Sequence, residues 1–200
     1  RPLPYPCYEK CLLGGVNTMK QLLLVVDYQV DFVDGALGFA GAEGLDGPIA
    51  QRIAQARADG WDVAFTMDTH NAGYLDTQEG RKLPVPHCLL NSDGWQLYGQ
   101  TGKAICKETD MVVCKPTFPS LWLGNWLKQQ GYDTVELCGL VSHICVLSNA
   151  VMAKAALPEA EIVVDAQLTA SYDPVLHQKA LDVLEGLQLT VLHRDRADSI

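Results

Sequence analysis

Short apolar runs alternate along the chain with longer stretches of helical composition. Several of the runs are apolar at every position, which is typical of strands that are buried on both faces of a parallel sheet. We expect six strands, at residues 22–26, 62–66, 111–114, 134–137, 161–164 and 187–192. We expect four helices between them, near residues 47–59, 120–130, 142–156 and 173–186.

This alternation of strands and helices predicts a three-layer α/β/α sandwich around a mostly parallel, Rossmann-like six-stranded sheet. One connection does not fit the alternation. Residues 68–110 form a stretch of about forty residues with little regular pattern, far longer than the usual link between elements. Connections of this length often carry function, so we look for functional residues here.

The 200 residues of the chain are 48% hydrophobic and 20% charged, which suits one globular domain with a full core. Residues 1–18 contain three prolines and a pair of glycines and show no periodicity. We interpret them as a poorly ordered N-terminal extension outside the core, with Met19 as a candidate natural start. We interpret residues 19–200 as a single domain.

The charge and the cysteines exclude several classes of protein. A formal net charge of -9 without any basic run argues against a nucleic-acid partner. The longest apolar run, residues 22–26, is far too short to cross a bilayer. Seven irregularly spaced cysteines do not resemble a secreted disulfide framework. We therefore expect a cytoplasmic protein with reduced thiols.

Polar residues follow the predicted strands at the edge where parallel α/β sheets bind ligands. Asp27 follows the first strand and Lys115 the third, while Cys145 follows the fourth, at the start of a helix that favours its thiolate. Each could be an ordinary loop or buried residue if taken singly. Together they form a nucleophilic set in which the carboxylate relays the thiol proton. His143 is a rival base, ranked second because it would point elsewhere.

A second group of polar residues lies in the long connection. Asp68 and His70 are two positions apart on an extended segment, so they share a face, and His87 lies in a proline-flanked segment. Asp76 and Glu79 lie between them. Two histidines with a carboxylate are a common ligand set for zinc, iron or manganese. The spacing matches no short metal motif, so unrelated surface residues are an equal alternative.

Five motifs give the chain a family resemblance. They are VVDYQVDF at residues 25–32, MDTH at 67–70, PVPHC at 84–88, VVCKP at 112–116 and GLVSHICV at 139–146. With them the chain resembles the isochorismatase-like cysteine hydrolases and, within that family, the nicotinamidases (pyrazinamidases). The resemblance covers nearly the whole predicted domain.

The resemblance implies a catalytic triad of Asp27, Lys115 and Cys145. It also implies a cis peptide bond between Leu140 and Val141, with the backbone N–H groups of Val141 and Cys145 forming an oxyanion hole. The implied reaction is the hydrolysis of nicotinamide to nicotinate and ammonia through a thioester on Cys145. The implied partner is therefore a small-molecule amide, and the family also suggests a homo-oligomer.

The resemblance further implies one divalent metal ion, with zinc favoured over iron and manganese. Asp68, His70 and His87 match three fixed ligands, and the fourth is His in some members and Glu in others. Asp76 occupies the position of the common histidine, and Glu79 fits the Glu-type variant better. The fourth ligand is therefore open between these two carboxylates. Some members of the family, such as the isochorismatases proper, lack these metal ligands. The presence of Asp68, His70 and His87 argues that this chain does not belong to that branch.

Phe32 and Phe118 could flank the ring of the substrate, although either could be a core residue, and that reading suits Phe118 better. Gln29 could orient the catalytic carboxylate or lysine, while Asp31 is either a surface residue or lies near the metal. Two alternatives stay open. One is a hydrolase of the same family acting on another small amide or ureido compound. The other is a non-catalytic or redox protein in which Cys145 forms disulfides.

Overall fold

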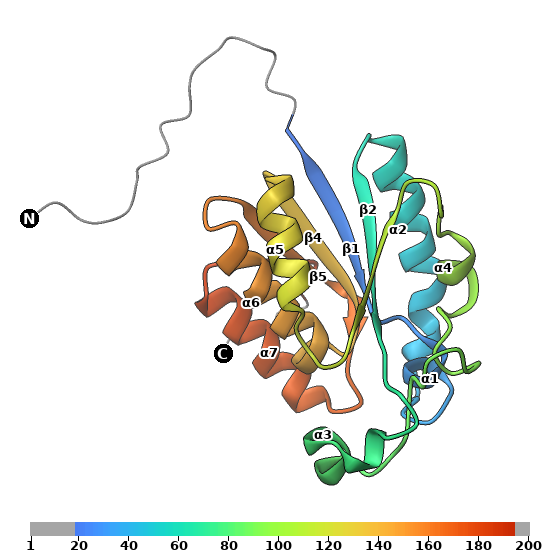
Figure 1. Ribbon diagram of the computed structural model, residues 1–200. Helices are drawn as coiled ribbons and strands as arrows, with labels where there is room; N and C mark the ends of the chain where they lie inside the picture. Colours follow the sequence, from blue (N-terminus) through green and yellow to red (C-terminus); the bar gives the residue numbers. More distant parts are fainter. Residues whose placement is uncertain (1–18, 195–200) are drawn as a thin grey trace, which may run out of the picture.

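The computed structural model describes residues 19–194, which form a six-stranded sheet with the strand order β3-β2-β1-β4-β5-β6 (Figure 1). Every pair of neighbouring strands is parallel, so the predicted six-stranded sheet is confirmed and is parallel throughout. The strands are β1 (Gln21–Val26), β2 (Asp62–Asp68), β3 (Met111–Lys115), β4 (Thr134–Leu140), β5 (Glu161–Ala170) and β6 (Thr190–Leu192).

Helices cover both faces of this sheet and give the predicted three layers (Figure 1). One side has α2 with the shorter α4 beside it, and the other has α5, α6 and α7. The elements of the two helical layers and of the C-terminal edge are α1 (Val30–Val33), η1 (Ala42–Leu45), α2 (Asp46–Ala58), α4 (Gly99–Lys103), α5 (Leu121–Gln130), η3 (Ser142–Val146), α6 (Leu147–Ala156) and α7 (Pro174–Gly186).

Burial of β1 on both faces explains its continuous apolar run. Successive side chains of a strand point to opposite faces. Leu23 therefore packs in the core cluster that contains Ile49 of α2, whereas Leu24 packs in the cluster that contains Leu123 and Leu127 of α5. The central strand has no solvent face, which makes its position in the sheet unambiguous.

The ends of the predicted helices agree with the structure where a side chain caps them. Ser120 accepts a hydrogen bond from the Leu123 N–H at the start of α5, and Asp173 caps α7 in the same way. The expected helix at 142–156 begins as the π-helical segment η3 before it continues as α6. The last strand starts later than expected, because the Leu187 and Leu189 N–H groups bond to the final turn of α7.

The long connection contains more regular structure than its sequence indicates. It holds η2 (Tyr74–Asp76) and α3 (Gln78–Lys82) as well as α4. The Thr77 hydroxyl caps α3 by accepting the Gly80 N–H. Figure 1 shows α3 beyond the end of β2, at the edge of the sheet where the strands terminate. This helix therefore brings residues of the connection to the predicted ligand edge.

The predicted N-terminal extension, residues 1–18, lies outside the described residues. Among residues 19–194, no helix has the length and apolar character needed to cross a membrane.

Candidate active site

Asp27 lies at the point where β1 ends, in a left-handed backbone conformation with φ 45°, and is completely buried. Its Oδ1 accepts a hydrogen bond of 2.6 Å from the Thr66 hydroxyl, and its Oδ2 lies 2.5 Å from the Lys115 ammonium. Burial raises the pKa of the Asp27 carboxyl, and the charge of Lys115 opposes this rise. Asp27 is therefore more basic than an exposed aspartate but has a cation to hold it ionised.

Lys115 is the last residue of β3, beside Asp68 in the register of β2 and β3. Its Nζ lies 3.6 Å from the Cys145 sulfur and 3.8 Å from Asp68 Oδ1, and it donates a hydrogen bond to the Thr117 carbonyl. Burial acts to lower its pKa, but the carboxylates of Asp27 and Asp68 beside it raise the pKa well above its ordinary value. Lys115 therefore remains an ammonium and joins the other two predicted catalytic residues, Asp27 and Cys145.

Cys145 lies in η3, just before α6, with only 5% of its surface exposed. Burial raises the pKa of its thiol well above the ordinary value; Lys115 opposes this effect, and Asp27 adds to it. Lys115 therefore favours the thiolate, as expected, but burial outweighs its effect on the pKa of the thiol. A base is then needed to remove the thiol proton.

The position of the His143 side chain supports the choice of Asp27 over His143 as the base that takes the Cys145 proton. Its Nδ1 lies 2.9 Å from the Ser171 hydroxyl, and its side chain is not among those that line the cavity over Cys145. Asp27 is thus the base candidate that the structure brings into contact with the lysine and the thiol.

Four side chains from the long connection and the end of β2 form one cluster, whose ligand atoms all lie within 4.8 Å of one another. Asp68 Oδ2 is 3.0 Å from His70 Nε2 and 3.2 Å from His87 Nε2, and Glu79 Oε1 is 3.7 Å from His70 Nε2. Asp76 is exposed on the surface and lies outside the cluster. Two imidazoles and two carboxylates fit a borderline divalent ion such as zinc.

Electrostatics make this cluster attractive to a cation. Burial acts to raise the pKa of Asp68, but hydrogen bonds to His70 and His87 and the charge of Lys115 hold it well below its usual range. Burial and the neighbouring Asp68 raise the pKa of Glu79. Two carboxylates thus share a partly desolvated site, and a cation would relieve their mutual repulsion.

The parts of the cluster are held by hydrogen bonds to loops. His87 Nδ1 lies 2.8 Å from the Val85 carbonyl, a geometry in which Nδ1 donates and Nε2 is left to face Asp68. Asp31 accepts the N–H of Cys88, which follows the histidine, so it lies near the candidate metal site rather than free on the surface. Gln29 binds the backbone of Asp68, and not the catalytic carboxylate or lysine as its sequence position suggested.

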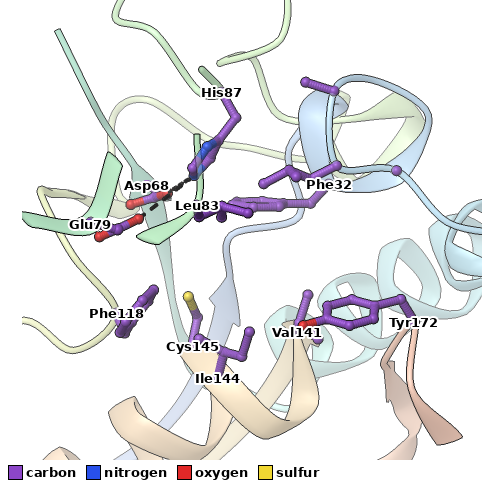
Figure 2. A pocket seen from close by; sticks show the side chains of 13 residues that line it. Phe32, Asp68, Glu79, Leu83, His87, Phe118, Val141, Ile144, Cys145 and Tyr172 are labelled. Atoms are coloured by element: carbon purple, nitrogen blue, oxygen red, sulfur yellow. Dashed lines mark ion pairs between the residues drawn. The ribbon is translucent and has the colours of Figure 1, made fainter. Parts of the chain in front are cut away.

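The thiol and three members of the cluster, Asp68, Glu79 and His87, face one cavity of about 370 Å³ (Figure 2). Phe32 lines it and packs on His87 with ring centroids 5.5 Å apart. Phe118 also lines it and is 41% exposed, so the reading of Phe118 as a core residue is wrong. Both phenylalanines predicted to flank a substrate therefore lie at this cavity, one on each side in Figure 2.

The peptide bond between Leu140 and Val141 is cis, as the family resemblance implies. It joins the end of β4 to η3, so Val141 and Cys145 belong to one turn at the cavity wall. Their backbone N–H groups remain the candidates for an oxyanion hole.

Sequence reasoning did not single out every residue of the cavity wall, and among those it missed are Leu83, Ile144 and Tyr172. Leu83 comes from the long connection, and Ile144 precedes the cysteine in η3. Tyr172 follows β5, so the rule that ligands bind beyond the strand ends could have found it. Leu83 and Ile144 do not directly follow a strand, so their sequence positions do not indicate that they line a ligand cavity.

Comparison with known proteins shows what this site and fold are similar to. The family model described as the isochorismatase domain matches residues 21–195. The nicotinamidase of Saccharomyces cerevisiae is 23% identical over 214 residues, which cover 86% of this chain and 99% of that protein. The crystal structure of nicotinamidase/pyrazinamidase from Bacillus subtilis gives a TM-score of 0.78 at 27% identity, covering 86% of this chain and 99% of the other. The pyrazinamidase of Pyrococcus horikoshii in complex with zinc gives 0.76 at 21% identity, covering 88% and 99%.

Proposed function

This chain belongs to the isochorismatase family, and we propose that it is a metal-dependent cysteine amidohydrolase that converts nicotinamide to nicotinate and ammonia. The observation that carries the proposal is the shared cavity: Cys145 lines the same cavity as Asp68, Glu79 and His87. Behind the cavity wall, Lys115 joins the Cys145 sulfur to the buried Asp27 carboxylate. The similarity to nicotinamidases over most of the chain supports the choice of substrate.

The first half of the proposed reaction forms a thioester. Asp27 takes the proton of the Cys145 thiol as the sulfur attacks the carboxamide carbon, and a C–S bond forms. The raised pKa of the buried Asp27 carboxyl suits this role, because a more basic carboxylate accepts the proton more readily. Asp27 then gives the proton to the nitrogen as the C–N bond breaks and ammonia leaves.

The second half returns the free enzyme. Water attacks the thioester carbon while Asp27 accepts one proton from that water, and the C–S bond breaks. The product acid loses its remaining proton to solvent and leaves as nicotinate. The proton on Asp27 then returns to the Cys145 sulfur. Throughout, the Lys115 ammonium would stabilise whichever neighbour is negative, because it lies within 3.6 Å of the sulfur and 2.5 Å of the carboxylate.

Backbone groups would stabilise the charge that develops on the carboxamide oxygen. We assign this role to the N–H groups of Val141 and Cys145, which lie in the turn after β4 at the cavity wall. Donors that are fixed before the reaction stabilise such an oxyanion without a cost of reorganisation.

We propose that Asp68, His70, Glu79 and His87 hold one divalent ion, zinc in the first place. The ion would supply Lewis-acid chemistry beside the thiol. The fit of the two imidazoles and two carboxylates supports this assignment, and so does the zinc complex of the P. horikoshii protein of the same fold. Phe32 and Phe118 would enclose the substrate ring between them.

Release of ammonia from nicotinamide tests the proposal. Purified protein is compared with Cys145→Ala and with Cys106→Ala, a control cysteine outside the cavity wall that pairs with Glu108. Each is measured after EDTA treatment and after zinc or manganese is restored. We expect activity that follows metal content, is lost in Cys145→Ala and is kept in Cys106→Ala.

The result can also separate the alternatives. Metal-loaded protein that releases no ammonia from nicotinamide would overturn this substrate, and a panel of small amides and ureido compounds would then be examined. Activity that survives in Cys145→Ala would overturn the cysteine mechanism altogether.

A further inference from the structure

The cavity over Cys145 has two chemically different ends. The ligand cluster with Asp68, Glu79 and His87 lies at one end. Tyr172 lies at the other, on the side of Val141 away from that cluster (Figure 2). The sulfur faces the space between them, so a substrate whose amide reaches the sulfur can extend toward Tyr172.

Tyr172 is held in place although 58% of its surface is exposed. Its ring makes edge contacts with His143 at 5.2 Å and with Phe39 at 6.3 Å between centroids, both at 76°. His143 is itself fixed by the Ser171 hydroxyl at 2.9 Å. The orientation of the phenol is therefore set before any ligand arrives, which reduces the entropy lost on binding.

The hydroxyl of Tyr172 is available to a ligand. Figure 2 shows the ring entering the cavity with its hydroxyl end directed toward the Val141 side. Across residues 19–194, no hydrogen bond joins this hydroxyl to another protein group. A phenol can both donate and accept, so it can recognise either kind of polar group.

The size and charge of the cavity define the group that Tyr172 would bind. A volume of about 370 Å³ lies in the range of pockets that enclose drug-sized ligands, which are larger than a ring with one carboxamide. Leu37 and Gly38 give the neighbouring wall an apolar character, and no lysine or arginine of the described chain lines the cavity. An uncharged polar group fits such a wall better than an anion, which would have no cation to pair with there.

We infer that Tyr172 is a specificity-determining residue that hydrogen-bonds an uncharged polar substituent on the acyl part of the substrate. The preferred substrates are then small aromatic amides that carry a hydroxyl or carbonyl group beyond the ring. This inference rests on the proposed amidase function and deepens it, because it names the class of amide that fills the cavity.

The test uses matched pairs of nicotinamides. One member of each pair carries a hydroxymethyl group on the ring, and the other carries ethyl, which has a similar size but no hydrogen-bonding group. We expect the zinc-loaded wild-type protein to prefer the hydroxymethyl member by about three- to ten-fold in kcat/KM, the value of one neutral hydrogen bond. Tyr172→Phe keeps the ring and should remove this preference, mainly through KM. Val175→Ala, at an exposed position three residues after Tyr172 that does not line the cavity, should retain it.

The outcomes separate this inference from the proposed function. Hydrolysis of unsubstituted nicotinamide without any preference within the pairs would overturn the inference and leave the function standing, as would a preference that Tyr172→Phe retains. If the protein hydrolyses the hydroxymethyl amides but not nicotinamide, and this activity depends on Tyr172, the inference is supported. Nicotinamide is then replaced by these amides as the proposed substrate. Hydrolysis of none of these amides would overturn both.

Discussion

Gln29 binds both backbone groups of Asp68 through the two ends of its side-chain amide. Its Oε1 accepts the Asp68 N–H at 2.7 Å, and its Nε2 donates to the Asp68 carbonyl at 2.9 Å and to the Trp95 carbonyl at 2.8 Å. Gln29 is completely buried two residues after Asp27. This contact therefore ties the segment that carries the proposed base to the residue that begins the ligand cluster.

Replacing this amide should destabilise the protein. In Gln29→Leu the Asp68 N–H and carbonyl lose their partners inside the protein, which should lower the free energy of unfolding by about 2 to 4 kcal/mol. Urea denaturation of the metal-free protein measures the loss. Gln55→Leu is the control, since Gln55 is exposed and bonds only Asp59, and should change stability by less than about 0.5 kcal/mol. Equal effects in the two variants would contradict the role of Gln29.

The identity of the fourth ligand can be decided with two single substitutions. Glu79→Gln removes a charge from the cluster, whereas Asp76→Asn removes one from the exposed surface three residues earlier. We expect the zinc affinity of Glu79→Gln to fall by at least about ten-fold. Asp76→Asn should bind zinc as the wild type does. Competition with a chelating dye measures both, and the reverse result would make Asp76 the ligand.

Loss of the proposed base should affect the rate more than binding. Asp27→Asn keeps the shape of the side chain but cannot accept the Cys145 proton, so kcat for nicotinamide should fall by about 10²- to 10⁴-fold. The KM should change far less. Steady-state kinetics on zinc-loaded protein measure this, and a kcat within a few-fold of wild type would assign the base elsewhere.

The buried ion pair of Asp27 and Lys115 predicts that removing one charge destabilises the protein more than removing both. Asp27→Asn leaves the Lys115 ammonium buried without its closest anion, which should destabilise the fold by about 3 to 5 kcal/mol. The double variant Asp27→Asn/Lys115→Met removes both charges and should recover a large part of this loss. Urea denaturation of the two variants and of Lys115→Met completes the cycle. Simple additivity of the single effects would show that the two charges are not coupled.

Zinc binding should weaken in mild acid because His87 must lose its proton to act as a ligand. Burial acts to lower the pKa of His87, but its hydrogen bonds to Asp68 and Val85 raise it above the ordinary value of 6.5. Because the pKa of His87 is raised, protons compete with zinc for this side chain at a higher pH than for an ordinary histidine. Zinc affinity is therefore greatest above this pKa and falls as the pH drops through it. We expect about ten-fold weaker zinc binding at pH 6 than at pH 8. Equal zinc affinities at the two pH values would contradict this direction.

The fold and the catalytic group follow from local features of the sequence. The run at residues 22–26 is apolar at every position because β1 is covered on both faces, so it could be read as a central parallel strand. Once the strands are placed, their ends meet at one edge, which brings Asp27 and Lys115 together beside Cys145. No knowledge of side-chain packing was needed for this step.

The surroundings of these residues depended on tertiary structure. The sequence left the fourth ligand open between Asp76 and Glu79, with Glu79 the better fit, and the folding of α3 turns Glu79 toward the histidines. The sequence indicated that the helix end favours a thiolate at Cys145, but it did not indicate the burial that raises the pKa of this thiol. Helix position can be read locally, whereas the extent of burial cannot.

By itself, then, the sequence determined the sheet, the edge at which the candidate site lies and the residues proposed to act there, because strand burial and strand ends leave a periodic pattern in one dimension. The tertiary structure decided the burial that raises the pKa of Cys145, the fourth member of the ligand cluster and the presence of Tyr172 at the far end of the cavity. These properties arise from desolvation and from contacts between segments far apart in the chain, and neither quantity is encoded at a single position.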